Sequence, residues 1–216
     1  MGVTITQHER LSAAPKVSAN GLFRPLAGMR VLDFTKILAG PLCTQYLADL
    51  GADVVKVEPL HGDDTRGWPP FANGVGAIFT AVNRNKRGIA VDLKQPDGLA
   101  IAHALAREAD IVVESFGPGV ADRLGIGWDQ LRAINPRLVY CSCPGYPEGH
   151  HLADRPGYDA LVQASSGQQW EQPGWRPGPI FLHMPMPSMG ACFLIPSGIL
   201  AALIAREETG RGQHVT

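Results

Sequence analysis

The sequence lacks an excess of charge of either sign, because 19 Lys and Arg side chains are balanced by 20 Asp and Glu side chains. Proteins that bind nucleic acid or acidic membrane surfaces usually carry a clear positive excess. We therefore expect neither a nucleic acid nor a membrane as the partner of this chain.

The sequence also lacks a long uninterrupted hydrophobic run. The longest run, residues 191–205, contains Pro196 and Gly198 and is shorter than the roughly 20 residues that cross a bilayer. Residues 1–16 have no apolar core and so do not resemble a secretory signal. These two observations predict a cytoplasmic protein.

Cysteine is scarce, with Cys43, Cys141, Cys143 and Cys192 as the whole set. In a reducing compartment such residues are expected as free thiols and not as disulfides. The spacing of Cys141 and Cys143 differs from that of a zinc-binding pair, and alternation along a strand would place both sulfurs on one buried face. We expect buried thiols and no metal site.

What the sequence does contain is an alternation of apolar strand-like and helix-like segments after a polar stretch, 1–25, which we interpret as a mobile arm. The alternation predicts an α/β fold with a Rossmann-like open parallel sheet and flanking helices. A further extended segment begins at residues 213–216, where the sequence stops, so we expect a truncated domain. The expected strands are 29–34, 53–58, 89–93, 110–114 and 138–142, and the expected helices are 42–50, 95–109, 129–134 and 197–208.

Polar and glycine-rich turns follow the expected strands, at the edge where such sheets bind ligands. The turn 35–41 leads directly into a helix, so its N–H groups could meet an anion or an oxyanion, although an ordinary turn would look the same. Three cations in 83–87, with Lys94, suit phosphates or a solvated loop. Phe116 could stack on a purine or pack under its loop, and Arg123 could pair with a phosphate.

No side chain stands in a recognised setting for nucleophilic catalysis. Ser188 and Ser197 lack the first glycine of a nucleophile elbow, and neither a dinucleotide fingerprint nor a His-Glu-x-x-His motif occurs. Asp159 is either a partly buried carboxylate with a shifted pKa or, more commonly for such a position, the cap of a helix that starts near residue 160.

Seven stretches in order together resemble the class III CoA-transferase family, which includes formyl-CoA and carnitine CoA-transferases and the α-methylacyl-CoA racemases. They are VLDF (31–34) with AGP (39–41), LGADVVKVE (50–58), GDDTR (62–66), NKR (85–87), DIVVESFGPG (110–119), RPGYD (155–159), and GILAAL (198–203) with TGRGQ (209–213).

This resemblance implies that residues 26–216 are the N-terminal part of the family's large domain, while the small domain is supplied by sequence outside this chain. It implies a CoA thioester and a carboxylic acid as substrates, with no permanently bound cofactor. It also implies two interlocked chains, either a homodimer or a heteromer with a homologous subunit or half that bears an aspartate. The residues expected at CoA are Leu38, Ala39, Pro59, Val91, Lys94, Ser115, Phe116, Arg123, Pro156, Gly157, Tyr158 and Asp159.

Two of these positions depart from the formyl-CoA transferases. Pro59 replaces an arginine, which removes a phosphate contact, and Leu38 replaces a glutamine, which disfavours a formyl or oxalyl substrate.

The largest departure concerns the nucleophile. Family transferases use an aspartate ten residues before the GILAAL segment to attack the thioester and form a mixed anhydride. Here that position is Ser188, and no acidic residue lies between Glu171 and Glu207. An unactivated hydroxyl cannot replace the carboxylate. The racemase branch also needs a histidine where Tyr158 stands.

The expected function is therefore a CoA-transferase component that binds CoA but lacks the nucleophilic aspartate. A non-catalytic acyl-CoA-binding or regulatory module and a racemase-like isomerase are the alternatives. An NAD-linked oxidoreductase is disfavoured because the glycine fingerprint is missing.

Overall fold

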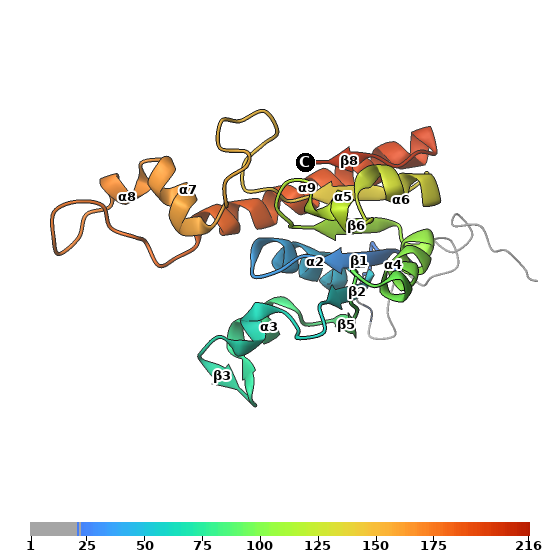
Figure 1. Ribbon diagram of the computed structural model, residues 1–216, viewed down its shortest axis with the longest axis horizontal. Coiled ribbons are helices and arrows are strands. Elements are labelled where there is room, and N and C mark those ends of the chain that lie inside the picture. The colour runs from blue at the N-terminus through green and yellow to red at the C-terminus, as the bar shows by residue number, and fades with distance from the viewer. Residues whose placement is uncertain (1–20, 22) are drawn as a thin grey trace, which may run out of the picture.

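The computed structural model describes residue 21 and residues 23–216, and its centre is a six-stranded parallel sheet (Figure 1). The strand order is β5-β2-β1-β6-β7-β8. This confirms the predicted open parallel sheet with flanking helices. The strands are β1 (Arg30–Phe34), β2 (Asp53–Glu58), β5 (Lys86–Ala90), β6 (Ile111–Glu114), β7 (Val139–Ser142) and β8 (His214–Val215).

Helices cover both faces of this sheet. On one face α2 (Ala39–Asp49) and α9 (Met186–Thr209) pack on the strands, with Leu47 and Ile199 fully buried. On the other face lie α4 (Pro96–Glu108), α5 (Val120–Arg123) and α6 (Trp128–Ile134). Strands buried on both sides need apolar residues throughout, which explains the continuous Ile-Val-Val run of β6.

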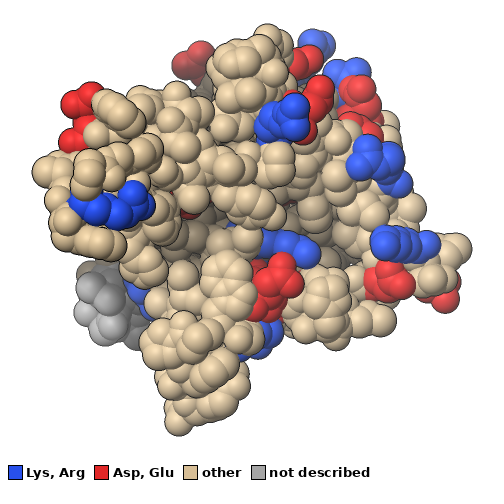
Figure 2. All heavy atoms as spheres, turned by 60° about the vertical axis from the view of Figure 1, so that its left-hand side comes forward, with Lys and Arg blue, Asp and Glu red and all other residues tan. Residues whose placement is uncertain are grey.

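Two lobes extend from the edge at which the parallel strands end (Figure 1). The first follows β2 and contains the 3-10 helix η1 (Asp64–Gly67), the hairpin β3 (Phe71–Ala72) and β4 (Val75–Gly76), and α3 (Ala77–Val82). The second precedes α9 and contains α7 (Asp159–Ser165) and α8 (Gln168–Glu171). Figure 2 looks toward this side, and charged side chains are sparse on its left-hand part.

Two expected elements were placed wrongly. The strand expected at 89–93 is observed as β5, which begins and ends three residues earlier. The strand can begin at Lys86 because the ammonium of this residue is buried against Asp33, at 3.0 Å. The expected helix 197–208 begins eleven residues earlier, at Met186, and continues through Pro196. The hairpin β3–β4 and helix α3 were not expected.

Helix α9 is long and apolar enough to cross a membrane by length and composition, with a mean hydropathy of 2.0 in its most apolar window. No membrane-spanning segment was expected from the sequence, because only residues 191–205 were considered and α9 is longer than that run. Core helices of soluble proteins pass the same test, and Ile199, Leu203 and Arg206 of α9 are buried in this fold.

The four cysteines are free, as expected, and Cys43, Cys141 and Cys192 are buried while Cys143 is partly buried. Burial raises the pKa of the Cys43 thiol well above its ordinary value. Most of the expected mobile arm, residues 1–20 and 22, lies outside the described residues. Arg24, near the end of that segment, donates to the Gly51 carbonyl oxygen at 3.3 Å.

Candidate functional site

The order in which successive strands are added to the sheet reverses between β1 and β6, which is therefore the topological switch point. Strands β2 and β5 extend the sheet on one side of β1, and β7 and β8 extend it on the other side of β6. Open α/β sheets bind ligands at this switch point, beyond the carboxyl ends of the strands. Here the Lys36 N–H donates to Ser115 Oγ at 3.0 Å, so the turns that carry Leu38 and Phe116 meet.

The turn after β1 is held in one conformation. Ile37 has a φ of 70°, a left-handed value that is unfavourable for a β-branched residue and is found at functional turns. A Cβ on Gly40 would lie 2.4 Å from Thr35 Cβ, so only glycine fits there. No side chain caps α2 at its N-cap, Leu38, which leaves the positive end of this helix open to an anion.

Buried ion pairs lie directly beneath this turn. Asp33 pairs with Lys86 at 3.0 Å, and Lys56 pairs with Asp63 at 3.1 Å, with all four side chains at most 2% exposed. Burial opposes ionisation of Asp33, but Lys86 and nearby hydroxyl donors outweigh it and lower the pKa of this carboxyl. Lys56 Nζ also donates to the Thr35 carbonyl at 2.8 Å, which ties the ion pairs to the turn.

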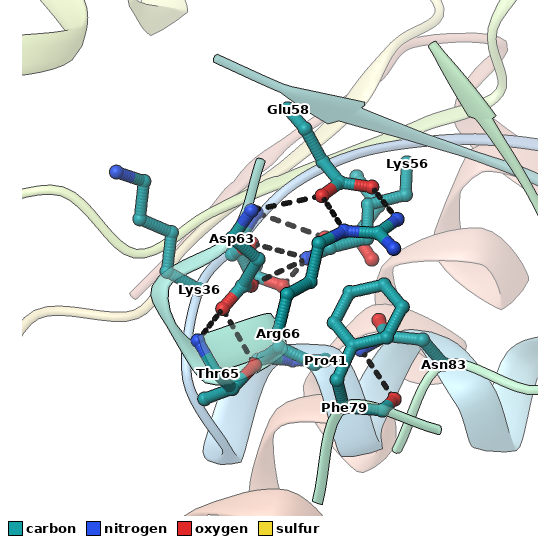
Figure 3. Close-up of polar contacts among 12 residues, drawn as sticks. Lys36, Pro41, Lys56, Glu58, Asp63, Thr65, Arg66, Phe79 and Asn83 are labelled. Carbon is teal, nitrogen blue, oxygen red and sulfur yellow. Dashed lines mark hydrogen bonds and ion pairs between the residues drawn. The ribbon is translucent and has the colours of Figure 1, made fainter. Parts of the chain in front are cut away.

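A second feature lies at the carboxyl end of β2. Glu58 accepts two hydrogen bonds of 2.7 Å from Arg66, whose guanidinium lies 3.8 Å from the centre of the Phe79 ring (Figure 3). A cavity of about 420 Å³ opens here, between Glu58 and Ala90. The expected CoA contacts Pro59 and Val91 directly follow these two residues, and Val91 N–H donates to the Glu58 carbonyl at 2.8 Å.

Each of the three cations in 83–87 pairs with an aspartate that is distant in the chain. Arg84 pairs with Asp49, Lys86 with Asp33, and Arg87 with Asp53. The pairs of Arg84 and Arg87 lie on the surface, as in a solvated loop, whereas Lys86 is buried with its partner and departs from both interpretations.

The expected segment 156–159 is fixed against the loop that follows β7. A Cβ on Gly157 would lie 2.1 Å from Gly145 Cα, so the two backbones touch with no room for a side chain. Tyr158, which follows, is 62% exposed.

Asp159 does not cap α7, which was the commoner alternative from the sequence. Tyr158 is the N-cap, without a side-chain bond, and the Asp159 carboxylate instead binds Ser188. It accepts from Ser188 N–H at 2.9 Å and from Ser188 Oγ–H at 2.6 Å. Because a carboxylate is a far weaker base than an alkoxide, this pair does not make Ser188 a strong nucleophile.

Ser188 lies in the first turn of α9, next to the first turn of α2. Both helices run from the carboxyl edge of the sheet toward its amino edge, so they are parallel to each other. They contact through stacked rings of Tyr46 and Phe193, 5.9 Å between centres. Tyr46 is seven residues beyond Ala39, and Phe193 is five residues beyond Ser188, so Ala39 and Ser188 lie at similar depth.

The remaining expected contacts, Lys94 and Arg123, are exposed side chains on the segments that follow β5 and β6. The expected residues therefore form a row along one sheet edge, from the β5 end to the β7 end, and not one compact cluster. With neighbouring strands about 4.8 Å apart, this row spans roughly 19 Å, which suits an elongated ligand.

The sequence interpretation missed Lys36 and the buried pairs of Asp33 and Lys56. The available signal was a charged residue inside an otherwise apolar strand, since such a charge must find a partner when it is buried.

Comparisons with known proteins identify the family of this chain. The family model described as CoA-transferase family III matches residues 26–216. The succinyl-CoA:glutarate CoA-transferase of Mus musculus is 41% identical over 89% of this chain and 44% of its own length. The formyl-CoA:oxalate CoA-transferase of Streptomyces coelicolor is 44% identical over 89% of this chain and 47% of its own length.

Among solved structures, a CAIB/BAIF family protein from Brucella suis matches with a TM-score of 0.83 and 39% identity. The match covers 88% of this chain and 52% of that protein. The chain thus spans about half the length of the relatives it matches.

Proposed function

Because the chain belongs to CoA-transferase family III, we propose that it is the CoA-binding component of an acyl-CoA:carboxylate CoA-transferase and lacks the nucleophilic aspartate. The observation that supports this most directly is Ser188. It stands at the position expected for the family aspartate, at the start of α9 and beside the Leu38–Ala39 turn.

The expected contacts support the orientation of CoA along the sheet edge. The cavity beside Pro59 and Val91 suits the adenylate end, and the exposed cations Lys94 and Arg123 are available to its phosphates. The thioester end would then lie near Ala39, where the uncapped N-terminus of α2 would stabilise the oxyanion of an attacked thioester.

A carboxylate must still attack that thioester. We propose that it comes from a homologous subunit or half that carries aspartate at the position of Ser188. In a complete cycle, this carboxylate would displace CoA thiolate to form a mixed anhydride, and the thiolate would attack the enzyme carbonyl of the anhydride to give an enzyme thioester and release the donor acid. The acceptor carboxylate would then displace CoA thiolate from the enzyme thioester and form a second anhydride. Attack of the thiolate on the acceptor carbonyl would release the acceptor as its CoA ester and restore the enzyme carboxylate.

Binding tests the first half of this proposal. CoA and acetyl-CoA are expected to raise the melting temperature of the chain, by an amount equivalent to about 2.7 kcal/mol at a hundredfold excess over Kd, whereas NAD is not. The measurement is a thermal-shift titration. Stabilisation by NAD alone would support the oxidoreductase, and no shift with any CoA species would refute the proposal.

Trapping with hydroxylamine tests the second half. The wild-type chain with acyl-CoA is expected to form no aspartyl or seryl adduct, since it has no nucleophile. Ser188→Asp is expected to form an aspartyl adduct only weakly at neutral pH. The new carboxylate would lie beside Asp159, and because the two charges repel, one of the carboxyls would tend to stay protonated and be a poor nucleophile. Ser188→Asp combined with Asp159→Asn should form it better.

Ser188→Asn is the matched control for trapping, since it has nearly the size of aspartate but no carboxylate. A wild-type adduct that Ser188→Ala abolishes would make serine essential and contradict the proposal.

A further inference from the structure

Lys36 is a cation at the switch point, on the turn that follows β1. The other cations of the neighbouring polar cluster, Lys56, Lys86 and Arg66, are each paired with a carboxylate. Among the described residues no carboxylate pairs with the Lys36 ammonium. Figure 3 shows its side chain directed away from the cluster.

The backbone holds Lys36 in place more firmly than is usual for a lysine on a loop. Its N–H donates to Ser115 Oγ at 3.0 Å, and the next residue, Ile37, has the left-handed φ of 70°. Lys36 is also partly buried, so its side chain has less freedom to lose when it binds an anion.

The position of Lys36 corresponds to the acyl end of the site and not to the adenylate end. It precedes Leu38 by two residues, and the first turn of α2 lies beside that of α9, where Ser188 stands. The expected contact nearest the adenylate end is Lys94, on the segment that follows β5, two strands away from β1.

We propose that Lys36 is a specificity-determining residue that pairs with the distal carboxylate of a dicarboxylic acyl group. This inference rests on the proposed function. It agrees with the name of the mouse relative, which refers to succinyl-CoA and glutarate, both derived from dicarboxylic acids. A single ammonium can neutralise the one charge that distinguishes such an acyl chain from a monocarboxylic chain of equal length.

The test compares glutaryl-CoA with pentanoyl-CoA, which has a methyl group in place of the distal carboxylate. Isothermal titration of the wild-type chain is expected to show about tenfold tighter binding of glutaryl-CoA, as a charge-assisted hydrogen bond would give. In Lys36→Met the ratio of the two Kd values should fall to about one, while the Kd of pentanoyl-CoA stays unchanged. Lys36→Arg should keep part of the preference.

Lys94→Met is the matched control, and it should weaken both ligands equally and leave their ratio intact. If Lys36→Met instead weakens glutaryl-CoA, pentanoyl-CoA and free CoA equally, Lys36 binds a phosphate and the inference is wrong. Equal binding of both thioesters by the wild-type chain also overturns it but leaves the proposed function standing. Failure of the wild-type chain to bind any CoA species would overturn both.

Discussion

At the scale of single residues, the ends of the strands carry two buried glutamates in opposite electrostatic settings. Glu58 and Glu114 are each 6% exposed. Burial would raise the pKa of Glu58, but its bonds to Arg66 outweigh that effect, and the pKa lies below its ordinary value. No cation among the described residues pairs with Glu114, and burial raises its pKa despite an accepted bond of 2.7 Å from Phe116 N–H.

The two glutamates are therefore expected to affect stability with opposite signs. Glu58 stabilises the fold above its unfolded pKa of about 4.3, and this contribution is lost as the pH falls through its lower folded pKa. Glu58→Gln should thus cost about 1 kcal/mol at pH 7, a modest figure because Arg66 is half-exposed, and much less at pH 3.

Glu114 opposes folding once it must ionise, as the pH rises from about 4.3 through its raised folded pKa. Glu114→Gln keeps an oxygen for the Phe116 N–H and should stabilise the fold at pH 7, with no gain at pH 3. Urea unfolding at the two pH values measures both variants. Destabilisation by Glu114→Gln at pH 7 would contradict this assignment of charge.

At the scale of elements, the sequence predicted the strands well where they are uniformly apolar. β2 was predicted with its observed bounds, and β6 and β7 to within one residue, because buried parallel strands leave a continuous apolar pattern. β5 was misplaced because a lysine such as Lys86 is normally expected in a solvated loop, and its buried partner Asp33 is distant in the sequence. Helix α9 was shortened because an internal proline normally ends a helix.

The candidate site was predictable only in part, for a related reason. The turns that follow β1 and β6 could be identified locally, while the family resemblance placed Leu38, Ser115 and Phe116 at CoA. The Lys36–Ser115 bond joins these two turns. The bond between Asp159 and Ser188 spans 29 residues and leaves no local trace, so helix capping was the natural but wrong expectation.

A buried ion pair anchors α9 to the sheet. Arg206 is 1% exposed and pairs with Asp110 at 3.2 Å, and Asp110 also accepts from Arg30 N–H at 3.0 Å. Arg206→Met is expected to destabilise the fold by about 3 kcal/mol, because it leaves the Asp110 charge buried without its cation.

The matched control is Arg87→Met, which removes the exposed pair with Asp53 and should cost less than about 1 kcal/mol. Chemical denaturation compares the two variants. Equal losses would mean that the Arg206 pair contributes no more than a surface pair.

At the scale of the whole molecule, the lobe made of residues 158–184 exposes several large apolar side chains. Trp170 is 70% exposed and Trp175 is 90% exposed, with Tyr158, Phe181 and Met184 also on the surface. Exposed aromatic patches of this kind commonly mark protein–protein contacts.

The chain is expected to self-associate through this lobe at micromolar concentration. Replacing Trp170 and Trp175 together with Gln should reduce the average mass measured by light scattering. Ile204→Gln, which removes an apolar side chain of similar exposure (69%) outside the lobe, should not. An unchanged mass in the tryptophan variant would place self-association elsewhere.

The backbone crossing of Gly145 and Gly157 has a consequence for how this protein can vary. Since the contact contains no side-chain atoms, no compensating substitution at a neighbour can make space for a Cβ at either position. Substitutions at Tyr158 and Asp159 can therefore change the side chains at these positions, while the glycine contact keeps their backbone beside the loop that follows β7.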